Sequence, residues 1–471
     1  MYLKAIYFVS EVVDVLNKVL ESTSSLDYEY ADLRYEYREG FSIEVRKGVV
    51  EASQVGIRRG VGIRVLADGA WGFASAESLE LEELRNALER AFKLAKTSAK
   101  AREKRVELAE VKVYKDRVSS RVKENPVDVP VEEKVGLALE VDRRITSYGD
   151  VIKDVSVMYL DGSFRKVFVS SEGAEIVVEG VRTYLRVYAT AGEAGKLSPA
   201  YEAIGGVKGF EIYRGEEPFQ LAKTVAERAI GLLKASLPKG GLLTVVLDNK
   251  LLALIVHEAF GHCAEADLVI SGDILTGKIG QKVASELVTI VDDPEPPNAN
   301  GWTPYDDEGV KARKVFIVEK GVLKEYMQSR ETAAVLGMEP TGNARAQDYS
   351  FVPIVRMRNT YMMPGDWDPE EIIRETREGF YLKGAFGGQA DANGDFMFSV
   401  QEAWRIENGK IKEPYRGVTV SGNAIEVLKS VDAVGKDFKI GFPGTCGKGQ
   451  MAPVDGGGPH IRCKIIVGGR R

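Results

Sequence analysis

The sequence predicts an α+β protein: an amino-terminal α+β domain of antiparallel meanders with helices, followed by a β-rich carboxy-terminal domain. In the first half, stretches of helical periodicity alternate with runs of β-branched and aromatic residues. Pro238-Lys239-Gly240-Gly241 is typical of a domain boundary, and short strand patterns rich in glycine and proline follow it. We therefore place the domains at residues 1–238 and 239–471.

The amino-terminal domain is predicted to begin with an amphipathic helix, because Val12, Leu16 and Val19 share one helical face. Strands are then expected over 28–37, 41–46, 49–58 and 62–66. Turns are expected between them at Glu39-Gly40, Arg59-Gly60 and Asp68-Gly69. Helical periodicity returns over 78–104.

A second unit of similar organisation follows the linker Pro126–Pro130. A helix is expected over 131–145 and another over 219–234. Between them, strands are expected over 151–160, 165–170, 175–179 and 183–189, with a turn at Asp161-Gly162. The amino-terminal domain therefore has the organisation of two similar α+β units.

The carboxy-terminal domain is predicted to start with a buried strand over 242–247 and a helix over 250–262, capped by Asp248 or Asn249. Further helices are expected from Asp368 and over 423–430. Strand patterns occupy 283–292, 315–318, 322–327, 353–360, 379–386, 395–407 and 410–415. The acidic segment 305–308 is interpreted as a solvent-exposed turn, or else as a contact to a metal ligand or a substrate amine.

Composition excludes several classes of protein. The net charge of -6 and the pI near 5.6 argue against a nucleic-acid-binding surface. No segment approaches the roughly 20 apolar residues that span a bilayer, and the amino terminus lacks the features of a signal peptide. The 3 cysteines are too few for a disulfide framework. We expect a soluble cytoplasmic protein that binds neither nucleic acid nor membrane.

One short segment carries most of the chemical information. The chain has 3 histidines, and two of them, His257 and His262, flank Glu258 in His257-Glu258-Ala259-Phe260-Gly261-His262. The zinc motif His-Glu-x-x-His is similar but one residue shorter. In a regular helix, residues five apart lie about 140° apart and cannot face one metal ion. The segment therefore predicts a helix that is locally under-wound or that ends near Gly261.

A catalytic zinc site also needs a third protein ligand. The local candidates are Cys263, Glu265 and Asp267, and the remote ones are Cys446, His460 and Cys463. Cys446 is favoured by its glycine-rich loop, in which Lys448 would promote deprotonation of the thiol. Ordinary packing in a turn or a strand is the alternative for each remote residue. For the motif itself, the alternatives are a polar helix end or a structural metal site, which would give Glu258 no role.

Several further segments give the chain a specific resemblance to the TldD/PmbA family of metallopeptidases, formerly described as modulators of DNA gyrase. The matching segments extend over nearly the full length and include the histidine motif. The others are Gly60–Ala74, Gly280–Ser285, Tyr305–Gly309, Arg358–Met362, Gly394–Phe396 and Cys446–Lys448. The chain resembles the metal-binding, TldD-like members, because it retains both histidines and the cysteine.

This resemblance implies a zinc peptidase that hydrolyses peptide bonds of small or unfolded polypeptides. His257, His262 and Cys446 would be the Zn²⁺ ligands, and Glu258 the general base. It also implies a dimer around an enclosed cavity, formed with a second copy or with a PmbA-like paralogue. The alternative function is a non-catalytic, metal-stabilised regulator of a partner such as a topoisomerase.

Overall fold

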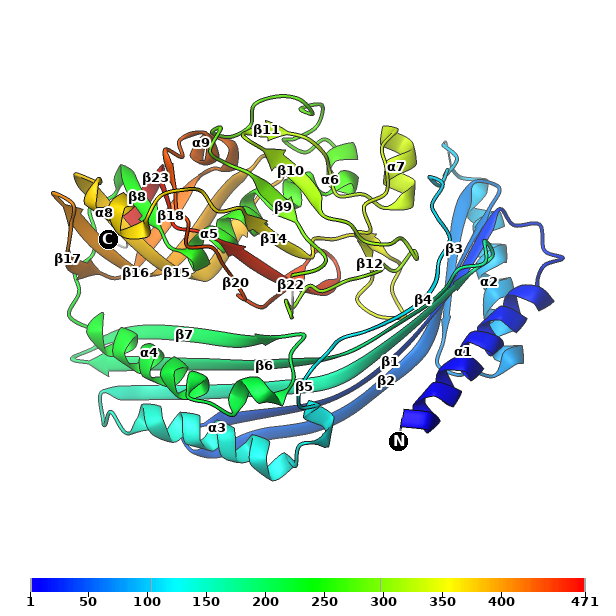
Figure 1. The fold of residues 1–471 in the computed structure, drawn as a ribbon, viewed down its shortest axis with the longest axis horizontal. Helices are drawn as coiled ribbons and strands as arrows, with labels where there is room; N and C mark the ends of the chain where they lie inside the picture. The colour runs from blue at the N-terminus through cyan, green and yellow to red at the C-terminus, as the bar shows by residue number, and fades with distance from the viewer. Residues whose placement is uncertain (1, 103, 297, 470–471) are drawn as a thin grey trace.

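The computed structural model describes residues 2–102, 104–296 and 298–469, and it confirms the predicted α+β class. A long curved sheet from the amino-terminal half passes beneath the β-rich carboxy-terminal half, which lies against its concave face (Figure 1). Among the described residues, no helix is both long and apolar enough to cross a membrane.

The amino-terminal half forms one sheet of seven strands, with strand order β3-β2-β1-β5-β6-β4 and with β7 paired to β6. All neighbours are antiparallel except β4 and β6. Its strands are β1 (Tyr30–Arg46), β2 (Val49–Ala67), β3 (Ala70–Ala76), β4 (Lys115–Ser119), β5 (Ile152–Ser170), β6 (Glu175–Glu193) and β7 (Lys196–Gly206). Its helices are α1 (Tyr2–Ser22), α2 (Leu81–Ala99), α3 (Val131–Thr146) and α4 (Glu217–Gly231).

The turns predicted at Glu39-Gly40, Arg59-Gly60 and Asp161-Gly162 are wrong, because β1, β2 and β5 each run straight through them. These glycines allow close approach inside long strands instead. A Cβ on Gly162 would lie 2.2 Å from the Glu39 carbonyl oxygen, and one on Gly60 would lie 2.3 Å from the Tyr349 ring. The turn at Asp68-Gly69 is confirmed, since both residues have positive φ.

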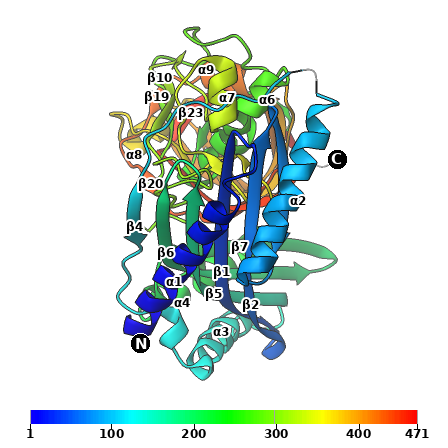
Figure 2. The ribbon, with the colours of Figure 1, turned by 90° about the vertical axis from the view of Figure 1, so that its right-hand side faces the viewer.

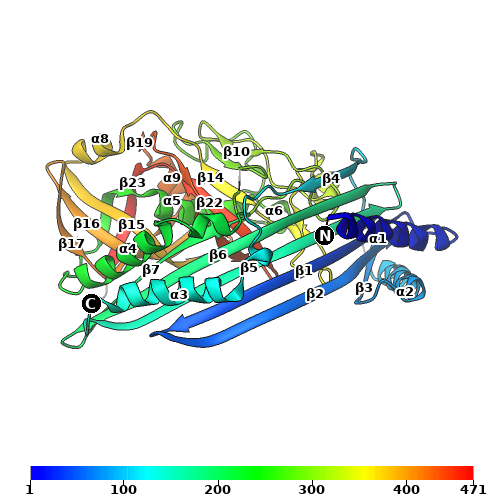
Figure 3. The same ribbon diagram turned by 60° about the horizontal axis from the view of Figure 1, so that its bottom comes forward.

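All four helices of this half cover the convex face of the sheet, α1 and α2 at one end and α3 and α4 at the other (Figures 2 and 3). Side chains alternate between the two faces along each strand, which explains why the helices cover one face and cavities lie on the other. On β6, Leu185, Val187 and Ala189 are buried against α3 and α4. The residues that alternate with them, among them Tyr184 and Arg186, are only partly buried and line cavities on the concave face.

The carboxy-terminal half contains two further seven-stranded sheets around the largest hydrophobic core. One has the order β11-β10-β9-β14-β22-β20 with β21 paired to β22, and the other β15-β8-β23-β18-β16-β17 with β19 paired to β23. The strands are β8 (Gly241–Leu247), β9 (Ile290–Asp292), β10 (Val315–Glu319), β11 (Val322–Leu323), β12 (Ala344–Arg345), β13 (Ile354–Val355), β14 (Asn359–Met362), β15 (Glu378–Ala390), β16 (Asp395–Glu407), β17 (Lys410–Tyr415), β18 (Val418–Asn423), β19 (Ala433–Val434), β20 (Lys439–Ile440), β21 (Gly444–Gly447), β22 (Met451–Gly458) and β23 (Ile461–Gly469). The α-helices are α5 (Asn249–Leu254), α6 (Ala266–Ile270), α7 (Arg330–Leu336), α8 (Pro369–Arg374) and α9 (Ala424–Lys429).

Three strands predicted in this half, over 283–292, 322–327 and 353–360, are shorter than expected or broken. Buried side-chain bonds replace the strand pairing there. Arg358 is fully buried, and its backbone N–H and its Nε each donate to Asp292 at 2.7 Å. Such a network cannot be recognised from a local strand pattern, because its partners are far apart in the sequence.

The acidic segment 305–308 is not a solvent-exposed turn, since Asp306, Asp307 and Glu308 are all buried where the two halves meet. Asp307 accepts a 2.8 Å bond from Lys166 on β5, and Glu308 accepts a 3.0 Å bond from Arg64 on β2. These ion pairs connect the curved sheet with the carboxy-terminal half, and each buried carboxylate has its cationic partner on the sheet.

Candidate metal centre

The segment with the two histidines follows β8 in the core of the carboxy-terminal half. Asp248 caps α5 by accepting a 2.8 Å bond from the Leu251 N–H. After Leu254, the helix widens into a π-helical turn over Ile255–Gly261, and the backbone N–H of His262 bonds to the carbonyl of His257. This bond spans five residues, so the two imidazole rings come together with centroids 5.4 Å apart. The predicted under-winding is confirmed.

Gly261 has a different role from the one predicted. Its φ of −60° is ordinary for a helix, so the wide turn does not depend on glycine's backbone freedom. Instead, a Cβ at this position would lie 2.3 Å from the sulfur of Met357. Gly261 therefore allows the π-helical turn to pack closely against the segment that contains Met357.

The structure brings together His257, His262 and Cys446. One potential ligand atom from each lies within 4.8 Å of the other two, and Cys446 Sγ is 3.2 Å from His262 Nε2. Cys446 lies on β21, which pairs with β22. The guanidinium of Arg356 holds this hairpin by donating to the carbonyls of Cys446 and Gln450 at 2.8 and 2.7 Å.

Glu265, a candidate ligand from the sequence, lies behind the cluster. Its carboxylate is 2.8 Å from His262 Nδ1, and this contact directs Nε2 toward Cys446. Lys448 contacts Glu265 at 3.1 Å and Asp267 at 2.6 Å. Its ammonium also donates to the Val355 carbonyl at 3.0 Å. Lys448 therefore bonds to these groups rather than to the thiol that we expected it to activate. The role of Glu265 could have been inferred from its position three residues after His262.

The remaining candidates lie in other contacts. The thiol of Cys263 is buried and lies 3.7 Å from the Ala259 carbonyl oxygen. Cys463 is buried on β23, within the core. His460 is bonded to Asp437 and Tyr381. In the described part of the chain, the group that could hold a metal ion is His257, His262 and Cys446.

The electrostatics of the cluster favour a thiolate. Burial raises the pKa of the Cys446 thiol, but the neighbouring imidazoles of His257 and His262 outweigh this effect and lower the pKa to about 5. For His262, burial lowers the pKa, whereas Glu265 and Cys446 raise it to a net value above the ordinary one. By contrast, burial raises the pKa of Cys263 and of Cys463.

The donor set fits a metal such as zinc, which prefers imidazole nitrogen and thiolate sulfur. His257 Nε2 is buried and has no hydrogen-bond partner in the described structure. A buried polar atom without a partner is costly, and a metal ion between the three side chains would satisfy it.

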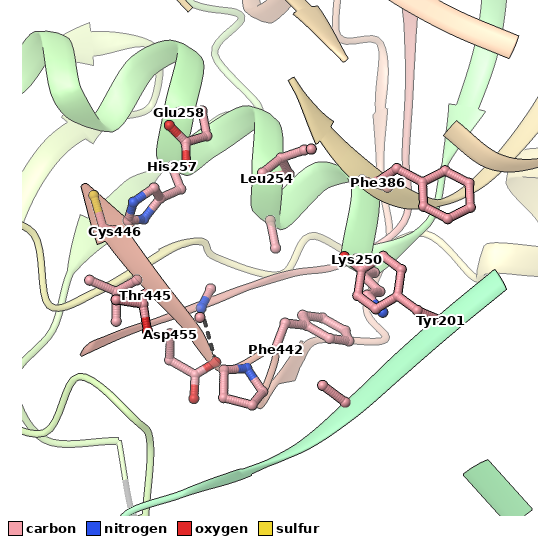
Figure 4. Close-up of a pocket in the computed structure, with 18 of the residues that line it drawn as sticks. Tyr201, Lys250, Leu254, His257, Glu258, Phe386, Phe442, Thr445, Cys446 and Asp455 are labelled. Carbon is pink, nitrogen blue, oxygen red and sulfur yellow. Dashed lines mark hydrogen bonds between the residues drawn. The ribbon is translucent and has the colours of Figure 1, made fainter. Parts of the chain in front are cut away.

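Glu258 points into a cavity of about 270 Å³ that His257 and Cys446 also line (Figure 4). Its side chain is 35% exposed, and its Oε2 lies 3.7 Å from His262 Nε2. Tyr184 of β6 and Tyr201 of β7 close the opposite wall. The cavity therefore lies between the curved sheet and the carboxy-terminal half, and sequence reasoning did not identify this wall.

Comparison with known proteins assigns the family. Models of the PmbA/TldA metallopeptidase domain 1, central domain and C-terminal domain match residues 31–95, 124–233 and 240–469. A metalloprotease of Methanocaldococcus jannaschii is 40% identical over 93% of this chain and 97% of its own. A zinc metalloprotease TldD homolog of Saccharolobus solfataricus is 33% identical over 96% of this chain and 99% of its own length.

Solved structures share the fold. TldE from Thermococcus kodakarensis has a TM-score of 0.81 at 20% identity, covering 97% of this chain and 100% of its own. A protein of Thermotoga maritima called a putative modulator of a DNA gyrase has a TM-score of 0.78 at 24% identity. The match covers 97% of this chain and 99% of that protein. The extent of these matches leads to one conclusion: the chain belongs to the PmbA/TldD family of metallopeptidases.

Proposed function

We propose that the protein is a zinc-dependent peptidase that hydrolyses peptide bonds of small or unfolded polypeptides. In this proposal, His257, His262 and Cys446 hold Zn²⁺ and Glu258 is the general base. The observation that carries it is the His257 imidazole, which lies beside a thiol, a second imidazole and a partly exposed carboxylate and has a buried Nε2 without a partner among the described residues.

The surroundings of the cluster favour a catalytic over a structural metal site. A structural zinc site is normally closed by four protein ligands, whereas a catalytic one keeps a position open. Here three potential ligands meet among the described residues, and the cavity reaches His257 and Cys446 from the remaining side. A water molecule or a peptide carbonyl can enter there.

Zn²⁺, when bound, lowers the pKa of a water ligand and polarises a peptide carbonyl. The chain's own residues supply the remaining functions. The Glu258 carboxylate accepts the proton of the attacking water and returns it to the leaving amine. Glu265 keeps His262 in the tautomer whose Nε2 faces the site, and Arg356 keeps Cys446 in place by binding the backbone of its hairpin.

Assembly belongs to the same proposal. We propose that the protein works in the cytoplasm as a dimer, formed with a second copy or with a PmbA-like paralogue. The first part of β2 supports a partner surface: Val55 and Ile57 are 71% and 63% exposed on a segment that pairs on one side with β1. Exposed apolar residues on a strand edge are typical of an association surface.

Glu258→Gln tests the catalytic role. We expect kcat/KM for an unfolded peptide to fall about 10²- to 10⁴-fold, because the general base is lost. Zinc content should stay at the wild-type level, because the ligands are unchanged. The exposed Glu426→Gln on α9 is the matched control and should keep full activity.

The same experiment separates the peptidase from a non-catalytic regulator. If the zinc-loaded wild type cleaves no unfolded peptide, the proposed function fails and the regulator is favoured. If Glu258→Gln retains wild-type cleavage, another residue must be the base.

A further inference from the structure

A second cavity, of about 730 Å³, adjoins the one at the metal centre. Tyr184 of β6 and Gly444 and Thr445 of β21 line both cavities, so the two lie side by side over the concave face of the sheet. Thr445 borders the metal-centre cavity beside Cys446 (Figure 4). The second cavity is therefore the neighbouring space for a peptide that is longer than the metal-centre cavity.

Arg182 of β6 lies in the wall of the second cavity and has unusual surroundings. Its Nη2 donates a 3.0 Å bond to the Asn300 carbonyl, and its guanidinium lies 5.1 Å from the centre of the Phe164 ring. Its Nε is buried and has no hydrogen-bond partner in the described part of the chain. Among the described residues, no carboxylate forms an ion pair with Arg182 within 4.0 Å.

Its neighbours increase the positive charge. The charged residues that line a small cavity of about 50 Å³ are Arg182, Arg38, Arg345 and Lys166, with Asp307 as the one carboxylate. Arg38 is bonded to Glu36, the nearby carboxylate whose charge favours the Arg182 cation. Arg345 donates to the carbonyls of Met357 and Pro453. Burial, and then the charges of Arg38 and Arg345, lower the pKa of Arg182 to about 9.

Arg182 as a whole is only partly buried, but its Nε is enclosed. A guanidinium that has lost part of its hydration without gaining an ion pair is unfavourable. A ligand with a carboxylate would reverse this cost, since arginine matches carboxylate geometry with two parallel bonds. On an unmodified peptide, carboxylates are the only anionic groups that this site could select.

The position of Arg182 relative to the metal centre suits a peptide. Asn300 accepts from Arg182 through its carbonyl and donates from its side chain to the Gly444 carbonyl at 2.8 Å. Gly444 precedes Cys446 by two residues on β21. Arg182 is therefore separated from the centre by a distance that a few extended residues can cover, at about 3.3 Å per residue.

We propose that Arg182 forms a subsite that binds a carboxylate of the peptide substrate, either the carboxy-terminal group or an acidic side chain a few residues from the cleaved bond. This inference rests on the proposed function and gives it a substrate preference. Arg182 is then a specificity residue, distinct from the metal ligands and from Glu258.

Matched peptides test the proposal on the zinc-loaded protein. One pair shares a sequence without acidic side chains and ends in a free carboxylate or an amide. A second pair is amidated and carries Glu or Gln near the carboxy terminus. We expect the carboxylate member of at least one pair to have a kcat/KM about tenfold or more higher in the wild type, as a charged hydrogen bond provides. In Arg182→Gln this ratio should fall to about 1.

The pair that shows the preference identifies the source of the carboxylate. Equal ratios in the wild type and in Arg182→Gln, or ratios of about 1 for both pairs in the wild type, would overturn the proposal. Arg182→Lys, which retains charge but not the two-pronged geometry, should keep part of the preference. Arg143→Gln, at an exposed position on α3, is the matched control and should keep all of it.

Binding measurements separate this subsite from the peptidase activity. In the Glu258→Gln protein, fluorescence anisotropy of labelled peptides should show tighter binding of the carboxylate member by a similar factor. If no protein cleaves any peptide but this binding preference persists, the peptidase function fails and the subsite stands. If cleavage occurs without a preference in rate or in binding, the subsite fails and the peptidase function stands.

Discussion

The protein contains two histidine environments in the same half of the chain, and they differ in how the ring nitrogens are satisfied. His460 has both nitrogens bonded within the protein, Nδ1 to Asp437 at 2.7 Å and Nε2 to the Tyr381 hydroxyl at 2.8 Å. In the metal centre, His257 Nε2 is buried without a partner among the described residues. An imidazole with both nitrogens bonded within the protein, such as that of His460, has a structural role. An imidazole with an unbonded nitrogen, beside a thiol and a second imidazole, is available to a ligand.

The backbone around each histidine matches this difference. His460 lies between two strands, β22 and β23, where the usual pairing continues on both sides. His257 and His262 lie in a π-helical turn, a rare element that is often found at functional sites. The unusual backbone occurs where one imidazole nitrogen, His257 Nε2, lacks a partner among the described residues.

The largest effect is expected when the centre loses its thiolate. Cys446→Ala should lower zinc affinity about 100-fold or more, because even the loss of an outer partner of a ligand costs about 10- to 100-fold. Peptide cleavage should be lost with the metal. Competition with a chelator, followed by measurement of bound zinc, gives the affinity.

His460→Gln is the corresponding substitution at the histidine that lies outside the metal centre. It should leave zinc affinity and cleavage unchanged, while the free energy of unfolding falls by about 1–3 kcal/mol as Asp437 and Tyr381 lose a partner. If Cys446→Ala binds zinc as the wild type does, or if His460→Gln loses its zinc, the distinction between the two environments is wrong.

A smaller effect is expected from Glu265→Gln. The carboxylate bonded to His262 Nδ1 orients the imidazole and increases its basicity, so its loss should lower zinc affinity about tenfold. Glu258 is untouched, so kcat at saturating zinc should change less than the affinity. A variant whose affinity equals that of the wild type would show that Glu265 only fills space.

The smallest expected effect is a change with pH in the reactivity of Cys446 in the metal-free protein. Because the pKa of Cys446 is lowered to about 5, its sulfur is a thiolate above that pH and a thiol below it. The rate of alkylation by iodoacetamide should therefore be constant from neutral pH down to about 6 and fall to half near pH 5. Mass spectrometry of the digested protein identifies which cysteine is modified.

The other two cysteines are the internal controls. Burial raises the pKa of Cys263 and Cys463, so neither should react at neutral pH. Added zinc should protect Cys446. A Cys446 rate that rises steeply between pH 7 and 9, as for an ordinary thiol with a pKa near 8.5, would contradict the thiolate assignment.

Local geometry explains what the sequence could predict. The five-residue separation of His257 and His262 excludes a regular helix around one metal, so the under-wound turn followed from spacing alone. The choice of Cys446 could not follow from spacing, because it lies 184 residues from His262. Its hairpin of β21 and β22 is held at the site by the parallel pairing of β22 with β14, which is distant in the sequence. That choice came from the family resemblance, and its role as a ligand stays a prediction.

The errors share a physical cause. Glycine pairs read as turns, such as Asp161-Gly162, lie inside strands of up to 19 residues, because a neighbouring strand needs the space of the missing side chain. The acidic segment 305–308 reads as exposed because its cationic partners, Lys166 and Arg64, are more than 100 residues away. Arg182 similarly looks like an ordinary outward position on an alternating strand.

The buried ion pairs of the 305–308 segment also limit how a substrate can arrive. To swing the curved sheet away from the carboxy-terminal half, the protein would have to separate Lys166 from Asp307 and Arg64 from Glu308. Until water reaches them, charges separated in this way lack compensation, so the movement has an energetic cost. The cavity between the two halves is therefore expected to keep its width when a substrate binds. Under the proposed function, a cavity of about 270 Å³ at the metal centre accepts a thin, unstructured strand and not a compact folded domain.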